Sequence, residues 1–143
     1  MTKQQTEQDF ELLLELRKIA NSAIQDDLQK EHLLRLSVMS GCYQIFRNSN
    51  GDLLGYFAWA NVIRETVSRL YRSGEYPFYP CEWSEGGVML IIDVCFTPHF
   101  SSEAKIAFRS CIKNRRAITY RKGNRINLWL KCFRRYSSHV KFL

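Results

Sequence analysis

Acidic residues are missing from the last part of the sequence. All fourteen Asp and Glu lie at or before Glu103, together with only nine Lys and Arg, whereas the segment from Ala104 to the C-terminus holds twelve basic residues. This segment, called the basic segment below, gives the 143-residue chain its net charge of +7. A region of one charge sign attracts an acidic protein, a phosphate-bearing donor or a nucleic acid.

Long apolar runs and a signal-like start are also missing. The longest continuous apolar stretch, Val88–Ile92, is far too short to cross a bilayer. Residues Met1–Asp9 are polar and contain no basic region followed by an apolar one. We therefore expect a cytoplasmic protein with no transmembrane segment, which only a partner would hold at a membrane.

The cysteines form no C-x-x-C pair and are odd in number, which indicates neither a disulfide framework nor a zinc site. We expect each to be a small buried apolar residue. They are Cys42, Cys81, Cys95, Cys111 and Cys132. G-x-S-x-G, G-x-x-x-x-G-K-[ST] and H-E-x-x-H motifs are absent too, so serine hydrolases, P-loop nucleotidases and zincins have no support. The R-x-x-G-x-G/A loop, with which ordinary acetyl-CoA transferases bind the pyrophosphate of CoA, is also absent. This absence favours an acyl donor that is not held through a CoA pyrophosphate.

The apolar periodicities predict one α/β domain over residues 1–143, because 45% apolar residues suffice for a single core. The expected elements are helices over 8–24 and 27–39, a hairpin of 42–46 with 53–60, a helix over 61–72, a strand over 88–96, a helix capped by Ser101 or Ser102, and a hairpin of 117–121 with 125–133. The run 88–96 has the character of a central strand covered on both faces. This order suits a mostly antiparallel sheet flanked by helices.

Asp93 is the one charge inside that apolar run. A carboxylate there loses hydration and needs a partner. A nearby histidine or arginine would hold it ionised and ready to orient a base. The alternative is a structural role, in which Asp93 turns toward Thr97 and Pro98 and accepts hydrogen bonds from backbone amides.

Trp59 and Asn61 end the second predicted strand and are candidate substrate-binding residues. We expect Asp93 to face a cleft beside them. A core position also suits Trp59, and Asn61 could instead cap the helix that follows. The three histidines suit structural roles as well as a catalytic one. They are His32, His99 and His139.

Four short motifs, in order, resemble the acyltransferases that activate RTX toxins. They are GYFAWAN at 55–61, EWSEG at 82–86, IIDV at 91–94 and RAI at 116–118. The matched region spans about residues 33 to 131. The resemblance implies a divergent N-acetyltransferase fold, an acyl carrier protein as donor, and Asp93 at the catalytic aspartate position. An acidic carrier agrees with the basic segment.

The family's catalytic histidine falls near residues 21–23 of this chain, where no histidine stands. His32 is the nearest, and we take His32 with Asp93 as the candidate acid–base pair. We expect a set of basic residues to project from the late helix on one face and to bind the carrier or partner. This set is Arg109, Lys113, Arg115 and Arg116.

The short length and altered N-terminal part are most similar to the members of this family found in siderophore-microcin gene clusters. There, a small homologue and a larger partner join a glucosylated catecholate siderophore to the C-terminal serine of a microcin precursor, using ATP and magnesium. The resemblance therefore implies a maturation enzyme that acts on a precursor toxin or microcin peptide with a larger subunit or an acyl carrier protein. We expect no cofactor or metal on this chain itself.

Three alternatives stay open. The chain could be a carrier-dependent lysine acyltransferase that activates a protoxin, or a non-catalytic subunit that supports a larger ligase. It could also be a basic nucleic-acid-binding module, since aromatic residues are interleaved with the basic ones. No helix-turn-helix, zinc-finger or RNP-type segment supports this last reading, and we expect no DNA partner.

Overall fold

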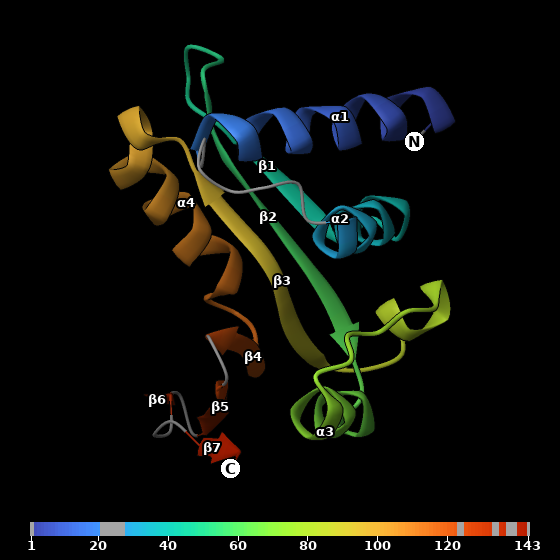
Figure 1. Ribbon diagram of the computed structural model, residues 1–143. Helices are drawn as coiled ribbons and strands as arrows, with labels where there is room; N and C mark the ends of the chain where they lie inside the picture. Colours follow the sequence, from blue (N-terminus) through green and yellow to red (C-terminus); the bar gives the residue numbers. More distant parts are fainter. Residues whose placement is uncertain (1, 21–27, 123–124, 133–134, 137–139, 143) are drawn as a thin grey trace.

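Different helices cover the two faces of a mixed sheet. In the computed structural model, which describes residues 2–20, 28–122, 125–132, 135–136 and 140–142, α1 (Lys3–Ala20) and α2 (Leu28–Met39) lie on one face and α4 (Ser101–Ile112) on the other (Figure 1). The other elements are β1 (Tyr43–Arg47), β2 (Leu53–Val62), α3 (Arg64–Ser73), η1 (Pro80–Trp83), β3 (Val88–Phe96), η2 (Pro98–Phe100), β4 (Ala117–Lys122), β5 (Arg125–Cys132), β6 (Arg135–Tyr136) and β7 (Val140–Phe142).

The strands are ordered β1-β2-β3-β4-β5, and both β6 and β7 pair with β5. All of these pairs are antiparallel except β3 with β4, which α4 connects as a crossover. The parallel register joins only Met89 to Ile118 and Leu90 to Thr119. The predicted α/β class, a largely antiparallel sheet with flanking helices, is confirmed.

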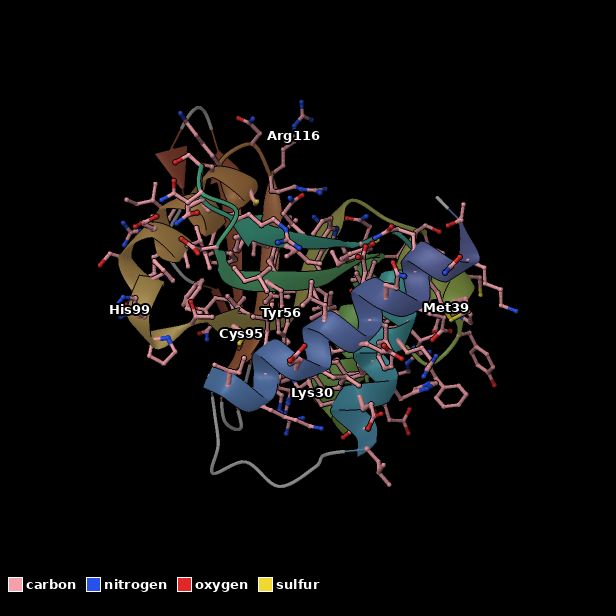
Figure 2. All side chains as sticks on the ribbon, turned by 90° about the horizontal axis from the view of Figure 1, so that it is seen from above. Lys30, Met39, Tyr56, Cys95, His99 and Arg116 are labelled. Carbon is pink, nitrogen blue, oxygen red and sulfur yellow. The ribbon has the colours of Figure 1, made fainter. Side chains whose placement is uncertain are left out.

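Two apolar clusters hold the layers together. Under α1 and α2 lie Leu13, Leu34, Tyr56 and Trp83, all fully buried, and seen from above α1 crosses the sheet over Tyr56 and Cys95 (Figure 2). Between the sheet and α4 lie Phe46, Phe57, Met89, Ala104 and Ile118. Among the described helices, none has the length and apolarity needed to cross a bilayer.

The predicted strand over 88–96 has the bounds of β3, but several helix ends differ. α1 begins at Lys3, and its predicted end at 21–24 lies outside the described residues, as does the expected start of α2 at Asp27. β2 continues to Val62, so Asn61 belongs to a strand and caps no helix. The N-cap of α4 is Phe100, without a side-chain hydrogen bond, so the expected serine cap is wrong.

The cysteines are less uniform than expected. Cys42 and Cys95 are buried, Cys111 is half-buried, and Cys81 is exposed, although Glu82 and Trp83 of the same short helix η1 are buried. The prediction of burial is therefore wrong for Cys81. The side chain of Cys132 lies outside the described part of the chain.

Candidate active-site cleft

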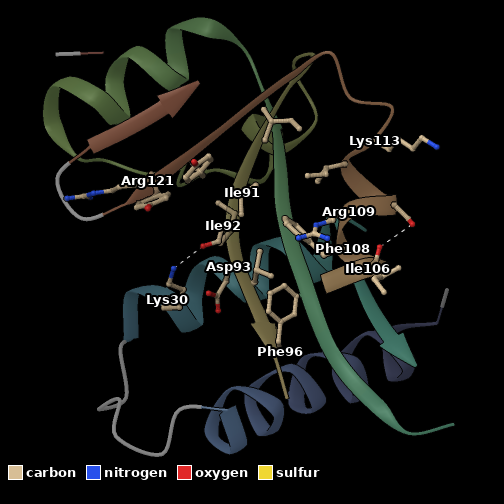
Figure 3. A pocket seen from close by; sticks show the side chains of 16 residues that line it. Lys30, Ile91, Ile92, Asp93, Phe96, Ile106, Phe108, Arg109, Lys113 and Arg121 are labelled. Atoms are coloured by element: carbon tan, nitrogen blue, oxygen red, sulfur yellow. Dashed lines mark hydrogen bonds between the residues drawn. The ribbon is translucent and has the colours of Figure 1, made fainter. Parts of the chain in front are cut away.

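A cleft of about 910 Å³ opens beside the part of β3 that follows its short register with β4. β3, β4 and α4 form its walls, and Lys30 of α2 and Tyr76 complete them (Figure 3). Its lining is mainly apolar. The apolar side chains are Ile91, Ile92, Val94, Phe96, Ile106, Phe108, Ile112 and Ile118. Asp93 is the one acidic residue among the described residues that line it.

A β-bulge decides which way Asp93 faces. Ala58 of β2 is opposite Asp93, whereas the next residue, Trp59, is opposite Ile91, so Ile92 is the extra residue of β3. Ile92 packs in the cluster under α1 and α2, and Asp93 bonds partners on that same side. Two consecutive residues thus turn toward the helices, where strict alternation would separate them.

Two side chains hold the carboxylate of Asp93. The Tyr56 hydroxyl donates a short hydrogen bond to Oδ2, and Arg17 Nη1 lies 3.1 Å from the same oxygen. The side chains of Arg17 and Asp93 are only 19% and 20% exposed, so solvent screens this ion pair less than a surface pair. Oδ1 has no hydrogen-bond partner among the described residues. Asp93 therefore has an arginine partner, one of the two that we expected, and Thr97 bonds the carbonyls of Leu53 and Leu54 instead.

Tyr56 remains protonated over the whole working pH range. Burial, and then the charge of Asp93 and the hydrogen bond to it, raise the pKa of Tyr56 far above its usual value near 10. Tyr56 is consequently a permanent donor that fixes Oδ2. Neither Tyr56 nor Arg17 was predicted as a site residue from the sequence. Alternation along β2 places Tyr56 on the same face as Ala58, opposite Asp93, but no sequence signal links Arg17 to a strand 76 residues later.

His32 lies apart from this arrangement. Its side chain is exposed on α2, and its ring centroid is 5.1 Å from that of Phe78. No contact among the described residues joins His32 to Asp93, so the acid–base pair stays a prediction. The position near 21–23 where the resembled family has its histidine lies outside the described residues.

Trp59 and Asn61 line a different part of the molecule from Asp93. Trp59 stacks on Phe57 at 4.8 Å on the α4 side of the sheet. The Arg115 guanidinium lies 5.8 Å from the Trp59 ring and donates to Asn61 Oδ1 at 3.4 Å. The expectation that Asp93 faces a cleft beside Trp59 and Asn61 is therefore wrong, because the bulge at Ile92 turns Asp93 away from them.

The predicted basic set is divided. Arg109 and Lys113 are exposed and line the cleft, Arg115 turns to Asn61, and Arg116 projects into solvent away from α1 (Figure 2). Only Arg109 lies within α4, which ends at Ile112, so the expectation that all four project from this helix is wrong. Lys113 is the C-cap of the helix, and Arg115 and Arg116 follow its last residue by three and four positions.

Two further cations make the cleft strongly positive. Lys30 Nζ donates to the Ile92 carbonyl at 2.9 Å beside the bulge, and Arg121 of β4 also lines the cleft (Figure 3). Together with Arg109 and Lys113, they surround an otherwise apolar space. Burial raises the pKa of Tyr76 in this lining, and the Arg121 guanidinium opposes the shift.

Neither a protein-family model nor a curated protein matches the chain. In the part of the chain that the structure describes, no group of three or more His, Cys, Asp and Glu residues gathers as a metal site. The site is thus defined by its own geometry: an apolar cleft, four cations, and one carboxylate fixed by Tyr56 and Arg17.

Proposed function

We propose that this chain is a cytoplasmic, acyltransferase-like maturation enzyme that modifies the precursor of a secreted toxin or microcin. The sheet with two helices on one face and a crossover helix on the other is compatible with the N-acetyltransferase-like fold that its motifs imply. The observation that carries the proposal is the placement of Asp93, held by Arg17 and Tyr56 at the wall of a large apolar cleft.

The lining of the cleft suits a donor with an apolar or aromatic body and an anionic part. Apolar walls would bury the body, and Lys30, Arg109, Lys113 and Arg121 would attract the anion. A glucosylated catecholate siderophore has this character, and so does an acyl chain on a phosphate-bearing carrier. We favour the siderophore conjugate with a microcin C-terminal serine, with ATP and magnesium held by a larger partner.

Asp93 would handle the acceptor proton. When an acceptor hydroxyl attacks the acyl carbonyl, a C–O bond forms, the leaving group departs with its electron pair, and the hydroxyl proton must be removed. Tyr56 and Arg17 fix Oδ2 of Asp93, so the carboxylate is oriented before substrate arrives. His32 would take part only if its ring left Phe78.

Co-expression tests the proposal. A microcin precursor would be produced with its larger partner, with and without this chain, and the peptide mass measured. We expect the siderophore mass only with this chain, and its loss with Asp93→Asn but not with Asp52→Asn, an exposed aspartate in the β1–β2 turn. Full modification with folded Asp93→Asn would assign the chemistry to the partner and make this chain a supporting subunit.

Carrier-dependent lysine acylation is the second candidate, favoured by the exposed pair Arg109 and Lys113 at the cleft. An acidic carrier protein would complement this pair. The same mass measurement separates the two candidates, because a fatty acyl group on a lysine adds a different mass at a different residue from a siderophore on a C-terminal serine.

A further inference from the structure

Three aromatic rings stand together at the surface near the start of α2. Phe78 and Tyr79 are 61% and 62% exposed, and their rings meet edge to face with centroids 5.4 Å apart. The exposed His32 ring is tilted against that of Phe78, with their centroids 5.1 Å apart. We call these three residues the aromatic patch. Large exposed aromatic groups cost hydration free energy unless a partner covers them, so such a patch marks an interaction site.

The backbone beneath the patch is fixed by a buried carboxylate. Glu82 Oε2 accepts the amide hydrogens of Phe78 at 2.8 Å and Tyr79 at 3.0 Å, and Oε1 accepts a hydrogen bond from Arg69. Burial would raise the pKa of Glu82, but the two amides and the Arg69 guanidinium together outweigh it and lower the pKa. The backbone that carries the two exposed rings is thus held in place, which lowers the entropy cost of binding a ligand.

The charge beside the patch is opposite to that of the cleft. A hollow of about 380 Å³ adjoins the rings and is lined by Gln29, Arg69, Glu75, Tyr76 and Glu82 in addition to Phe78 and Tyr79. Arg69 is its one cation among the described residues and is paired with Glu82, which leaves the exposed Glu75 as the net charge. Tyr76 lines both this hollow and the cleft, so the two adjoin.

We propose that the aromatic patch binds the acceptor polypeptide through a lysine or arginine side chain, placed on the rings of Phe78 and Tyr79 and near Glu75. Cations bind aromatic faces, and a carboxylate beside them adds attraction. Past Tyr76, the same polypeptide would reach the cleft, so donor and acceptor approach Asp93 from surfaces of opposite charge. This inference rests on the proposed function, because it assumes a polypeptide acceptor.

Binding of labelled peptides tests the patch without any transfer reaction. The probes are fluorescein-labelled peptides of repeating Gly-Ser-Lys and of repeating Gly-Ser-Glu, measured by anisotropy at low salt. The chain carries a net charge of +7, so unspecific attraction favours the glutamate peptide. We expect the double variant Phe78→Ala/Tyr79→Ala to bind the lysine peptide about tenfold more weakly and to bind the glutamate peptide with unchanged affinity. Glu75→Gln should weaken the lysine peptide only.

Met39→Ala is the matched control, because Met39 is 61% exposed on α2 but contributes nothing to the patch. Unchanged affinity of the lysine peptide in the double variant, or equal loss in Met39→Ala, would overturn the proposal. Thermal unfolding should be the same in all variants, since the substituted side chains are exposed.

Failure of the acceptor-binding site and failure of the proposed enzymatic function give different results when peptide binding and transfer are both measured. If the lysine peptide needs the patch while no modification of any precursor occurs, the binding site stands and the enzymatic function fails. If modification proceeds in the double variant with an unchanged KM for the precursor, the patch is not the acceptor site and the enzymatic function stands.

Discussion

Tyr56 and Asp93, 37 residues apart in the sequence, are joined across β2 and β3 by a hydrogen bond to the same carboxylate oxygen that Arg17 contacts. Tyr56 is fully buried, so its hydroxyl has no water to replace that bond. Tyr56→Phe should lower the free energy of unfolding by about 1.5–3 kcal/mol, the usual contribution of a hydrogen bond to a charged group. Urea unfolding measures this, and Tyr79→Phe, whose side chain is largely exposed, should change stability by less than about 0.5 kcal/mol.

Asp93→Asn and His32→Ala should have different effects on transfer. Asp93→Asn removes the charge that Arg17 and Tyr56 hold in place, so we expect at least a hundredfold loss of kcat in a folded protein. His32→Ala should leave kcat within about threefold and raise the KM for the acceptor, because the ring packs on Phe78. Equal loss of kcat in both variants would instead show that the two residues pair in the working complex.

The cations of the cleft should control donor or partner binding by charge. Reversal of both Arg109 and Lys113 to glutamate should weaken binding of the donor-carrying partner at least tenfold in low salt, and the difference should shrink as salt increases. Lys105→Glu is the control, because Lys105 is exposed on the same helix but does not line the cleft. Binding that survives charge reversal and high salt would mean that apolar contacts hold the partner.

Local sequence patterns predicted most helices and strands, whereas the pairing register between distant strands determines which side chains meet at the site. The apolar run of β3 and the turn residues around 48–52 are read from neighbouring residues, and both match the structure. The bulge at Ile92 arises from how β2 and β3 pair, so no local pattern reveals it. Yet this bulge turns Asp93 toward α1 and leaves Trp59 on the α4 side, which is why the expected neighbours of Asp93 are replaced by Tyr56 and Arg17.

The basic residues of the cleft were predictable only in part. Their charge and number are visible in the sequence, but which of them reach the cleft depends on where α4 ends and how β4 begins. Lys30 and Arg121 approach the cleft from α2 and β4, elements far apart in the chain, and composition alone could not place them there. Glu82 likewise fixes Phe78 and Tyr79 through contacts within a loop that has no periodicity to interpret.

Cys95 should make the protein less stable at high pH. Burial, and then the charge of Asp93, raise the pKa of Cys95 from 9.0 to about 11. The folded state therefore favours the thiol, so this contribution is complete below pH 9 and is lost as the pH rises toward 11. Its size is about 2–3 kcal/mol. Between pH 8 and pH 10.5, the free energy of unfolding measured in urea should decrease less for Cys95→Ala than for the wild type. An equal decrease would mean that Cys95 is not the group responsible.

Gly86 and Gly87 should respond very differently to alanine. The Gly86 amide donates to the Asn61 carbonyl at 3.2 Å, and a Cβ at Gly86 would lie 2.1 Å from the Val62 carbonyl oxygen, a contact that only a backbone shift relieves. Gly86→Ala should therefore lower the free energy of unfolding by about 2–4 kcal/mol and detach the loop that carries Glu82 and Trp83 from the end of β2. A Cβ at Gly87 meets nothing within 4 Å, so Gly87→Ala should cost less than about 1 kcal/mol. Chemical unfolding and the near-ultraviolet signal of the buried Trp83 measure both effects. Equal losses in the two variants would mean that the tight approach of the loop to β2 contributes nothing to stability.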